Sequence, residues 1–181
     1  NRQPLAQTFE EISTLERFTI VVVHLKSKNP PGGDEVADGD NRDCGDGQGY
    51  WNGDRTRAAN ELIDWLSSDP TGSHDPDYLI LGDMNSYRNE DPIMALRRAG
   101  YVNQISSQLA SNSYSYVFQG RWGELDHILA SPSLTGQVTG ASIWHINSDE
   151  SPDFGYDGIW SRPDKYRCSD HDPLIAGISL S

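Results

Sequence analysis

Apolar and polar residues alternate along the first part of the chain, and this pattern predicts paired β-strands. In residues 4–10 the side chains of Leu5, Gln7 and Phe9 fall on one side of an extended backbone. Residues 17–25 form a longer apolar run rich in β-branched residues, which favour strands. The two segments are close in sequence, so we expect them to pair as a hairpin.

Helical spacing replaces alternation in residues 54–68, where Asp54 is expected to cap the N-terminus. The apolar positions of this helix are Ala58, Ala59, Leu62, Ile63 and Leu66. A second helix is predicted to open at Asp91 and Pro92 and to end at Gly100.

Further strands are predicted after the first helix. Their ranges are 78–81, 114–118, 124–130, 138–146 and 173–180. Strands separated by helices, together with hairpins, indicate a mixed α/β fold built from packed layers. Neither an internal repeat nor a linker divides the sequence, so we expect residues 1–181 to belong to one structural unit.

Two long polar loops, residues 28–53 and 147–168, interrupt this pattern. The first carries a run of carboxylates between Asp38 and Asp46 that could bind a structural Ca²⁺. The run does not match an EF-hand, because Arg42 stands at position 5 and Gly49 at position 12. A calcium site therefore stays an open alternative to a solvated acidic loop.

Composition adds a strong negative charge to this picture. The chain has 27 acidic and 14 basic residues and a net charge of −13. Such a charge opposes tight metal-free binding to nucleic acid, but an enzyme can still contact phosphates through metal ions and a few local cations. The acidity also suits a secreted protein. No apolar run approaches the about 20 residues of a membrane span, so no membrane partner is expected.

The start of the chain and its two cysteines also bear on whether the protein is secreted. The sequence starts at Asn1 without a basic-then-apolar leader, and we interpret it as a mature, cleaved or engineered product. If the protein is secreted, Cys44 and Cys168 are expected to form a disulfide bond; the alternative is two free thiols.

Polar residues of related type lie at the ends of four predicted strands. They are His24, Asp83 with Asn85, Asp126, and Asp170 with His171. Asp83 and Asn85 are two positions apart, so on an extended backbone their side chains project to the same side. Each group alone is ordinary turn chemistry. Together they supply what phosphodiester hydrolysis needs: carboxylates for a divalent metal, an amide for a phosphate oxygen, and a histidine with a carboxylate partner.

These residues lie in four ordered segments that resemble motifs of the endonuclease/exonuclease/phosphatase family, which includes pancreatic deoxyribonuclease, abasic-site endonucleases and inositol-phosphate phosphatases. The segments are His24-Leu25-Lys26, Gly82-Asp83-Met84-Asn85, Leu125-Asp126-x-Ile128-Leu129-x-Ser131 and Ser169-Asp170-His171-x-Pro173. The flanking residues are most similar to those of secreted bacterial extracellular nucleases. The resemblance implies an α/β sandwich with two mainly antiparallel sheets flanked by helices.

The resemblance also implies catalytic roles for particular residues. His171 would be the general base or the imidazole that polarises the phosphate, and Asp126 would orient it. Asp83 would hold the attacking water, with a metal ion. Asn85 would contact the scissile phosphate, and His24 would be a second active-site imidazole.

The resemblance also implies which residues bind the metal ion and which make the remaining substrate contacts. Asp170, with Asp83, would bind Mg²⁺ or Mn²⁺. Arg2 and Lys26 would contact the substrate. The strands that carry an early Asn and a metal-binding Glu in the family have no counterpart here. Residues 1–181 therefore resemble the C-terminal portion of the domain, incomplete on its N-terminal side, and we expect activity to require the first portion as a separate polypeptide partner.

Three functions remain open at this point. The first is a secreted, metal-dependent endonuclease that cleaves DNA, with RNA as a further substrate. The second is a phosphatase or phosphodiesterase acting on lipid head groups or inositol phosphates. The third is an inactive, calcium-stabilised binding module; the filled acidic, amide and histidine positions argue against it.

Overall fold

A computed structural model describes residues 1–109, 113–155, 158–160 and 165–180, and it shows a layered α/β sandwich. Its centre is a five-stranded sheet with the order β1-β2-β3-β7-β4. The strands are β1 (Leu5–Glu10), β2 (Arg17–His24), β3 (Tyr78–Asp83), β7 (Asp126–Ala130) and β4 (Val102–Asn103). The predicted β1–β2 hairpin is present, and the mixed α/β class is confirmed.

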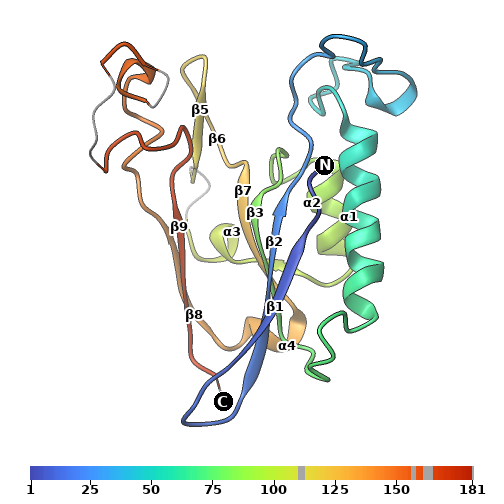
Figure 1. Cartoon of the computed structure of the whole chain (residues 1–181), viewed down its shortest axis with the longest axis vertical. Coiled ribbons are helices and arrows are strands. Elements are labelled where there is room, and N and C mark those ends of the chain that lie inside the picture. The colour runs from blue at the N-terminus through green and yellow to red at the C-terminus, as the bar shows by residue number, and fades with distance from the viewer. Residues whose placement is uncertain (110–112, 156–157, 161–164, 181) are drawn as a thin grey trace.

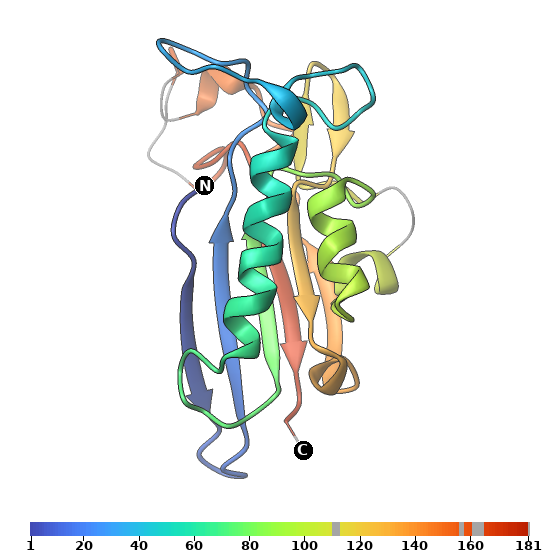
Figure 2. The ribbon, with the colours of Figure 1, turned by 90° about the vertical axis from the view of Figure 1, so that its right-hand side faces the viewer.

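Helices cover one face of this sheet (Figures 1 and 2). They are α1 (Asn52–Ser67) and α2 (Asp91–Arg98). Buried side chains from β2, β3 and the two helices, such as Val21, Ile80, Leu62 and Ile93, form the core of this layer. Because α1 lies in the connection from β2 to β3, these strands pair in parallel, whereas the neighbouring pairs are antiparallel.

A second, two-stranded sheet packs against the other face. It pairs β8 (Val138–Ile143) with β9 (Leu174–Ile178) in antiparallel fashion. Apolar residues of both sheets meet here, among them Leu79, Ile128, Leu174 and Ile178. An apolar groove of about 530 Å³ remains between the two sheets.

The shorter elements were not expected from the sequence, apart from the strand containing residues 116–118. A hairpin joins β5 (Tyr116–Phe118) to β6 (Arg121–Gly123) and stands above the central sheet in Figure 1. The remaining short elements are α3 (Gln104–Gln108), α4 (Pro132–Thr135), η1 (Gly39–Asn41) and η2 (Pro152–Phe154). Within the loop predicted over residues 147–168, positions 156–157 and 161–164 lie outside the described part.

Two local predictions were wrong. The first helix begins at Asn52, so Trp51 and not Asp54 is its N-cap. Cys44 and Cys168 are both free and exposed, so the expected disulfide is absent. The loops that carry them rise on opposite sides of the molecule in Figure 1, and Cys168 instead contacts Asn147 Oδ1 at 3.7 Å. None of the described helices combines the length and apolarity that crossing a membrane requires.

Candidate active site

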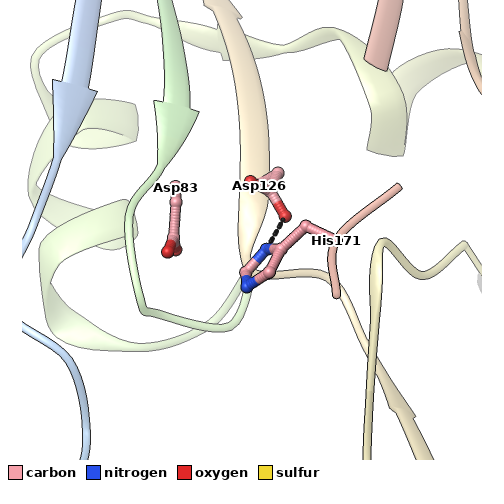
Figure 3. A group of neighbouring side chains, drawn as sticks. All are labelled: Asp83, Asp126 and His171. Carbon is pink, nitrogen blue, oxygen red and sulfur yellow. Dashed lines mark hydrogen bonds and ion pairs between the residues drawn. The ribbon is translucent and has the colours of Figure 1, made fainter. Parts of the chain in front are cut away.

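Strand register brings three of the predicted site residues into one row at the end of the central sheet. His24 at the end of β2 lies opposite Asp83 of β3, and Asp83 lies opposite Asp126 of β7. His24 Nε2 is 3.6 Å from Asp83 Oδ2. Figure 3 shows the two carboxylates on adjacent strands, with His171 arriving from a separate segment before β9.

Asp126 and His171 form the predicted hydrogen-bonded pair. His171 Nδ1 donates to Asp126 Oδ2 at 2.6 Å, which leaves Nε2 on the far side of the ring (Figure 3). The Ser115 hydroxyl donates to the same carboxylate oxygen at 2.7 Å. Burial opposes a charge on His171, but the hydrogen bond to Asp126 and the nearby carboxylates outweigh it and raise the pKa of this imidazole.

The segment that carries His171 is fixed by the residue that follows it. The buried Asp172 carboxylate accepts hydrogen bonds from the backbone N–H groups of Asn147 and Ser148, the Ser148 hydroxyl and His145 Nδ1. Burial opposes its ionisation, yet these hydrogen bonds lower its pKa. Asp172 therefore ties the histidine segment to the start of the second long loop.

A tight turn positions Asp83 and Asn85. Gly82 has φ of 133°, and a Cβ there would lie 2.1 Å from the Val23 carbonyl oxygen, so this position requires glycine. Asn85 is left-handed with φ of 45°, and its backbone N–H donates to Asp83 Oδ1 at 2.8 Å. Its amide nitrogen donates to Leu25 O and Asp83 Oδ2, both at 3.0 Å. Asn85 thus holds the turn here, and its phosphate contact stays a prediction.

Asp83, Asp126 and His171 fit a divalent cation. Each offers a ligand atom, and these atoms lie within 4.8 Å of one another. Burial and the neighbouring Asp126 charge raise the pKa of Asp83, so a cation bound here would offset the repulsion between the two carboxylates. Oxygen ligands of this kind are what Mg²⁺ prefers. Asp170, which was predicted as a ligand, lines the same cleft but is not part of this group.

A cleft of about 600 Å³ opens above these groups. Its walls contain four aromatic residues, Tyr50, Tyr87, Tyr116 and Phe118. Lys28 also lines it, forms an ion pair with Glu90 and lies 4.5 Å from the centre of the Tyr87 ring. The cleft therefore combines carboxylates and imidazoles with flat aromatic side chains.

Two predicted substrate contacts lie elsewhere. Lys26 does not line the cleft; it pairs with Glu35 and covers the Trp51 ring at 4.6 Å. Arg2 lines a different groove beside α1, and its backbone N–H donates to His24 O at 3.1 Å. Of the two lysines near the end of β2, the structure places Lys28 at the site.

The acidic loop shows no cluster of ligands. Among the described residues, its carboxylates do not form a group of three at metal-binding distance. Asp40 pairs with Arg57, while Asp43 and Asp46 accept backbone hydrogen bonds from Gly45 and Gln48. The structure thus gives no support to the alternative of a calcium site in this loop.

Sequence reasoning missed several residues that position the site. Ser115 contacts Asp126 and Tyr116 contacts His171. The buried Arg55 and His127 hydrogen-bond Ser86 in the turn after β3. Their sequence signals are weak, because a serine before a short strand or an arginine inside a helix is commonplace. His127 follows Asp126 directly and could have been noticed as a buried polar residue in an apolar strand.

The family of this chain follows from comparison with known proteins. Residues 10–171 match the model of the endonuclease/exonuclease/phosphatase family, and the chain belongs to that family. Its members hydrolyse phosphoester bonds and depend on divalent metal ions. A sequence search among curated proteins gave no significant match.

Solved structures share the fold at low sequence identity. A mannosyl-6-phosphatase from Bacteroides thetaiotaomicron aligns with a TM-score of 0.63 and 15% identity over 98% of this chain and 57% of its own. A 3′-5′ exonuclease from Neisseria meningitidis gives 0.58 and 13% over 90% and 62%. Sphingomyelinase C from Streptomyces griseocarneus gives 0.53 and 15% over 91% and 54%. The chain therefore spans little more than half the length of these proteins.

Proposed function

We propose that this chain carries most of the active site of a divalent-metal-dependent phosphodiesterase that cleaves nucleic acid, with DNA as the first candidate. The observation that carries the proposal is the Asp126–His171 dyad beside Asp83, with His171 and Asp83 lining the cleft. The metal, when bound between the carboxylates, would neutralise charge on the phosphate and the leaving oxygen.

The chain's own residues define the proton transfers. Asp126 accepts from His171 Nδ1 and so fixes the tautomer and the direction of Nε2, which is the nitrogen left for a water or a phosphate oxygen. Asp83 is half-buried beside it and can orient a water through a carboxylate oxygen. His24, at the other side of Asp83, can donate to a phosphate oxygen when protonated.

The cleft walls favour a nucleic acid over a small headgroup. Four aromatic rings and Lys28 surround the catalytic groups, and flat rings suit nucleobases on either side of a phosphodiester. The second candidate is hydrolysis of a phosphorylated sugar or lipid headgroup. Its support is the likeness of fold to proteins named mannosyl-6-phosphatase and sphingomyelinase C.

A substrate panel separates these candidates. The protein is incubated with Mg²⁺ and single-stranded DNA, duplex DNA, RNA, mannose 6-phosphate or sphingomyelin vesicles, each with and without a chelator. We expect chelator-sensitive cleavage of nucleic acid at internal diester bonds. Release of phosphate or phosphocholine from the last two substrates, with nucleic acid left intact, would contradict the nuclease proposal and support the second candidate.

A further inference from the structure

One face of the β5–β6 hairpin carries a row of aromatic rings that begins at the catalytic histidine. Tyr116 and Phe118 are two residues apart on β5, so they project to the same face. The Tyr116 ring lies 4.6 Å from the His171 ring and 6.4 Å from the Phe118 ring, and the two β5 rings are nearly parallel at 15°. The row leads outward from the dyad to the hairpin end, where Phe118 is 52% exposed.

The opposite strand adds no side chain of its own beside Tyr116, where the Tyr87 ring packs instead. Gly123 pairs with Tyr116 and contributes no side chain, and the Tyr87 ring occupies the space that a Cβ there would take, 2.3 Å away. Arg121 pairs with Phe118 across the hairpin. Among the residues that the structure describes, Arg121 forms no ion pair, so its charge is available to a ligand phosphate.

The charge of the chain indicates how such a ligand is held. With a net charge of −13, the chain has few cations that could contact a phosphate; Lys28 lines the cleft, and Arg121 lies opposite Phe118 on the hairpin. Aromatic stacking does not depend on charge and is tolerant of base sequence. It requires bases that are not already stacked inside a duplex.

We propose that the Tyr116–Phe118 face of the hairpin stacks the bases of single-stranded nucleic acid beside the scissile phosphate. This inference rests on the proposed function and specifies its substrate as a single strand. The base nearest the cut lies over Tyr116, the next one contacts Phe118, and Arg121 meets the phosphate between them or beyond.

The hairpin supplies a matched control for the test. Trp122 pairs with Val117, so it projects from the other face, and it is 66% exposed. Phe118→Ala and Trp122→Ala therefore each remove one exposed ring from the same hairpin, but only the first touches the proposed stacking face. Phe118→Trp retains a ring there and serves as the conservative variant.

The measurement is kcat/KM, with Mg²⁺, on a single-stranded oligodeoxynucleotide and on a strand of equal length built from abasic sugar-phosphate units. We expect Phe118→Ala to lower kcat/KM about tenfold on the base-containing strand, mainly through KM, and to leave the abasic strand unaffected. Phe118→Trp should restore the loss, and Trp122→Ala should change neither substrate by more than about twofold.

Two results would overturn the inference while leaving the proposed function in place. One is an equal loss on both strands, which would assign Phe118 a structural role. The other is an equal loss of kcat/KM in Trp122→Ala, which would show that the effect does not depend on which face of the hairpin carries the ring. A protein that hydrolyses sugar or lipid phosphates but cuts neither strand would instead contradict the proposed function itself.

Discussion

The Ser115 hydroxyl determines how the dyad is held. It accepts hydrogen bonds from the backbone N–H groups of Leu125 and Asp126, at 3.3 and 3.1 Å, and donates to Asp126 Oδ2 at 2.7 Å. The side chain is fully buried, so no water can replace it without rearrangement. Because the Asp126 carboxylate orients His171, a change at Ser115 should also alter the orientation of the His171 imidazole.

We predict that Ser115→Ala lowers kcat about tenfold with little change in KM, which is the scale of losing a supporting hydrogen bond behind an active-site ligand. Ser113→Ala is the control, because Ser113 donates to Glu124 at 2.7 Å and not to the dyad. The readout is steady-state hydrolysis of a diester with Mg²⁺. Equal losses in the two variants would show that the effect is general destabilisation.

Gly82 permits the approach of β3 to β2 at the site. A methyl group at this position would overlap the Val23 carbonyl oxygen, and the φ of 133° is unfavourable for any side chain. We predict that Gly82→Ala lowers the free energy of unfolding by more than about 2 kcal/mol in urea denaturation. Gly72→Ala, with positive φ but open space around its Cβ, should cost about 1 kcal/mol. Similar costs would contradict the steric argument.

Ionisation of Glu124 makes the free energy of unfolding depend on pH. Burial opposes its ionisation, but hydrogen bonds from His127, Ser113 and Asn103, with the charge of His127, lower its pKa from 4.5 to about 2. A pKa that is lower in the folded state stabilises the fold above about pH 4.5, and the contribution is lost as the pH falls toward 2. The full contribution is roughly 3 kcal/mol.

We therefore expect Glu124→Gln to be destabilised relative to the wild type at pH 6 and to approach it as the pH falls through this window. Denaturant melts at several pH values measure the difference. Glu61→Gln, at an exposed position of α1, should track the wild type throughout. A constant gap between Glu124→Gln and the wild type would show that Glu124 does not lose its charge in this range.

At the scale of elements, one buried arginine connects a helix, a loop and the turn after β3. Arg55 of α1 is 0% exposed and has no carboxylate within ion-pair distance among the described residues. Its guanidinium donates to the carbonyls of Lys26, Gln48 and Tyr50 and to the Ser86 hydroxyl, at 2.7 to 3.2 Å. His127 Nε2 donates to the Ser86 carbonyl at 2.7 Å, so the turn is held from two sides.

We predict that Arg55→Lys lowers the free energy of unfolding by about 2–4 kcal/mol, because lysine cannot span the same set of acceptors. The loop containing residues 26–50 should also become sensitive to limited proteolysis. Arg57→Lys, on an exposed position of the same helix that pairs with Asp54 and Asp40, is the control. Equal proteolysis of the two variants would show that Arg55 does not hold the loop.

Long periodic segments were predictable from the sequence, and short ones were not. The β1–β2 hairpin, β3, α1 and α2 follow from alternation or helical spacing, since each has enough residues for a period to show. Elements such as β4 and α4 depend on tertiary contacts. The row His24, Asp83 and Asp126 was predictable from motif resemblance, whereas Ser115 and Arg55 act through hydrogen bonds that only the folded chain creates. Lys26 was misplaced because motif position does not specify which lysine turns into the cleft.

At the scale of the whole molecule, the groove between the two sheets leaves apolar surface accessible. Phe18, Ile20 and Leu81 of the central sheet face Leu174 and Ile178 of β9 across about 530 Å³. Such apolar side chains would be stabilised if further polypeptide packed on them. We propose that further polypeptide of the same domain covers it, as the additional length of the structural relatives suggests, and that full activity depends on it.

The chain by itself should then bind a hydrophobic dye and show low activity. Supplying the remaining portion of the domain, from the same or a separate polypeptide, should suppress dye fluorescence and raise kcat together. Ile20→Asp, in the groove, should weaken this association, whereas Ile175→Asp, at an exposed position of β9, should not. A chain that is monomeric, dye-negative and fully active would contradict the proposal.

The central claim is that Asp83, Asp126 and His171 form one metal-dependent site for phosphoester hydrolysis. The most direct test is the rate of diester hydrolysis as Mg²⁺ is titrated, with His171→Ala compared with His145→Ala. Both histidines hydrogen-bond an aspartate through Nδ1, at 2.6 and 2.7 Å, but only His171 lines the cleft. We predict Mg²⁺-dependent hydrolysis that falls about a hundredfold or more in His171→Ala and less than about threefold in His145→Ala. Hydrolysis that persists in His171→Ala, or that does not respond to the metal, would contradict the account.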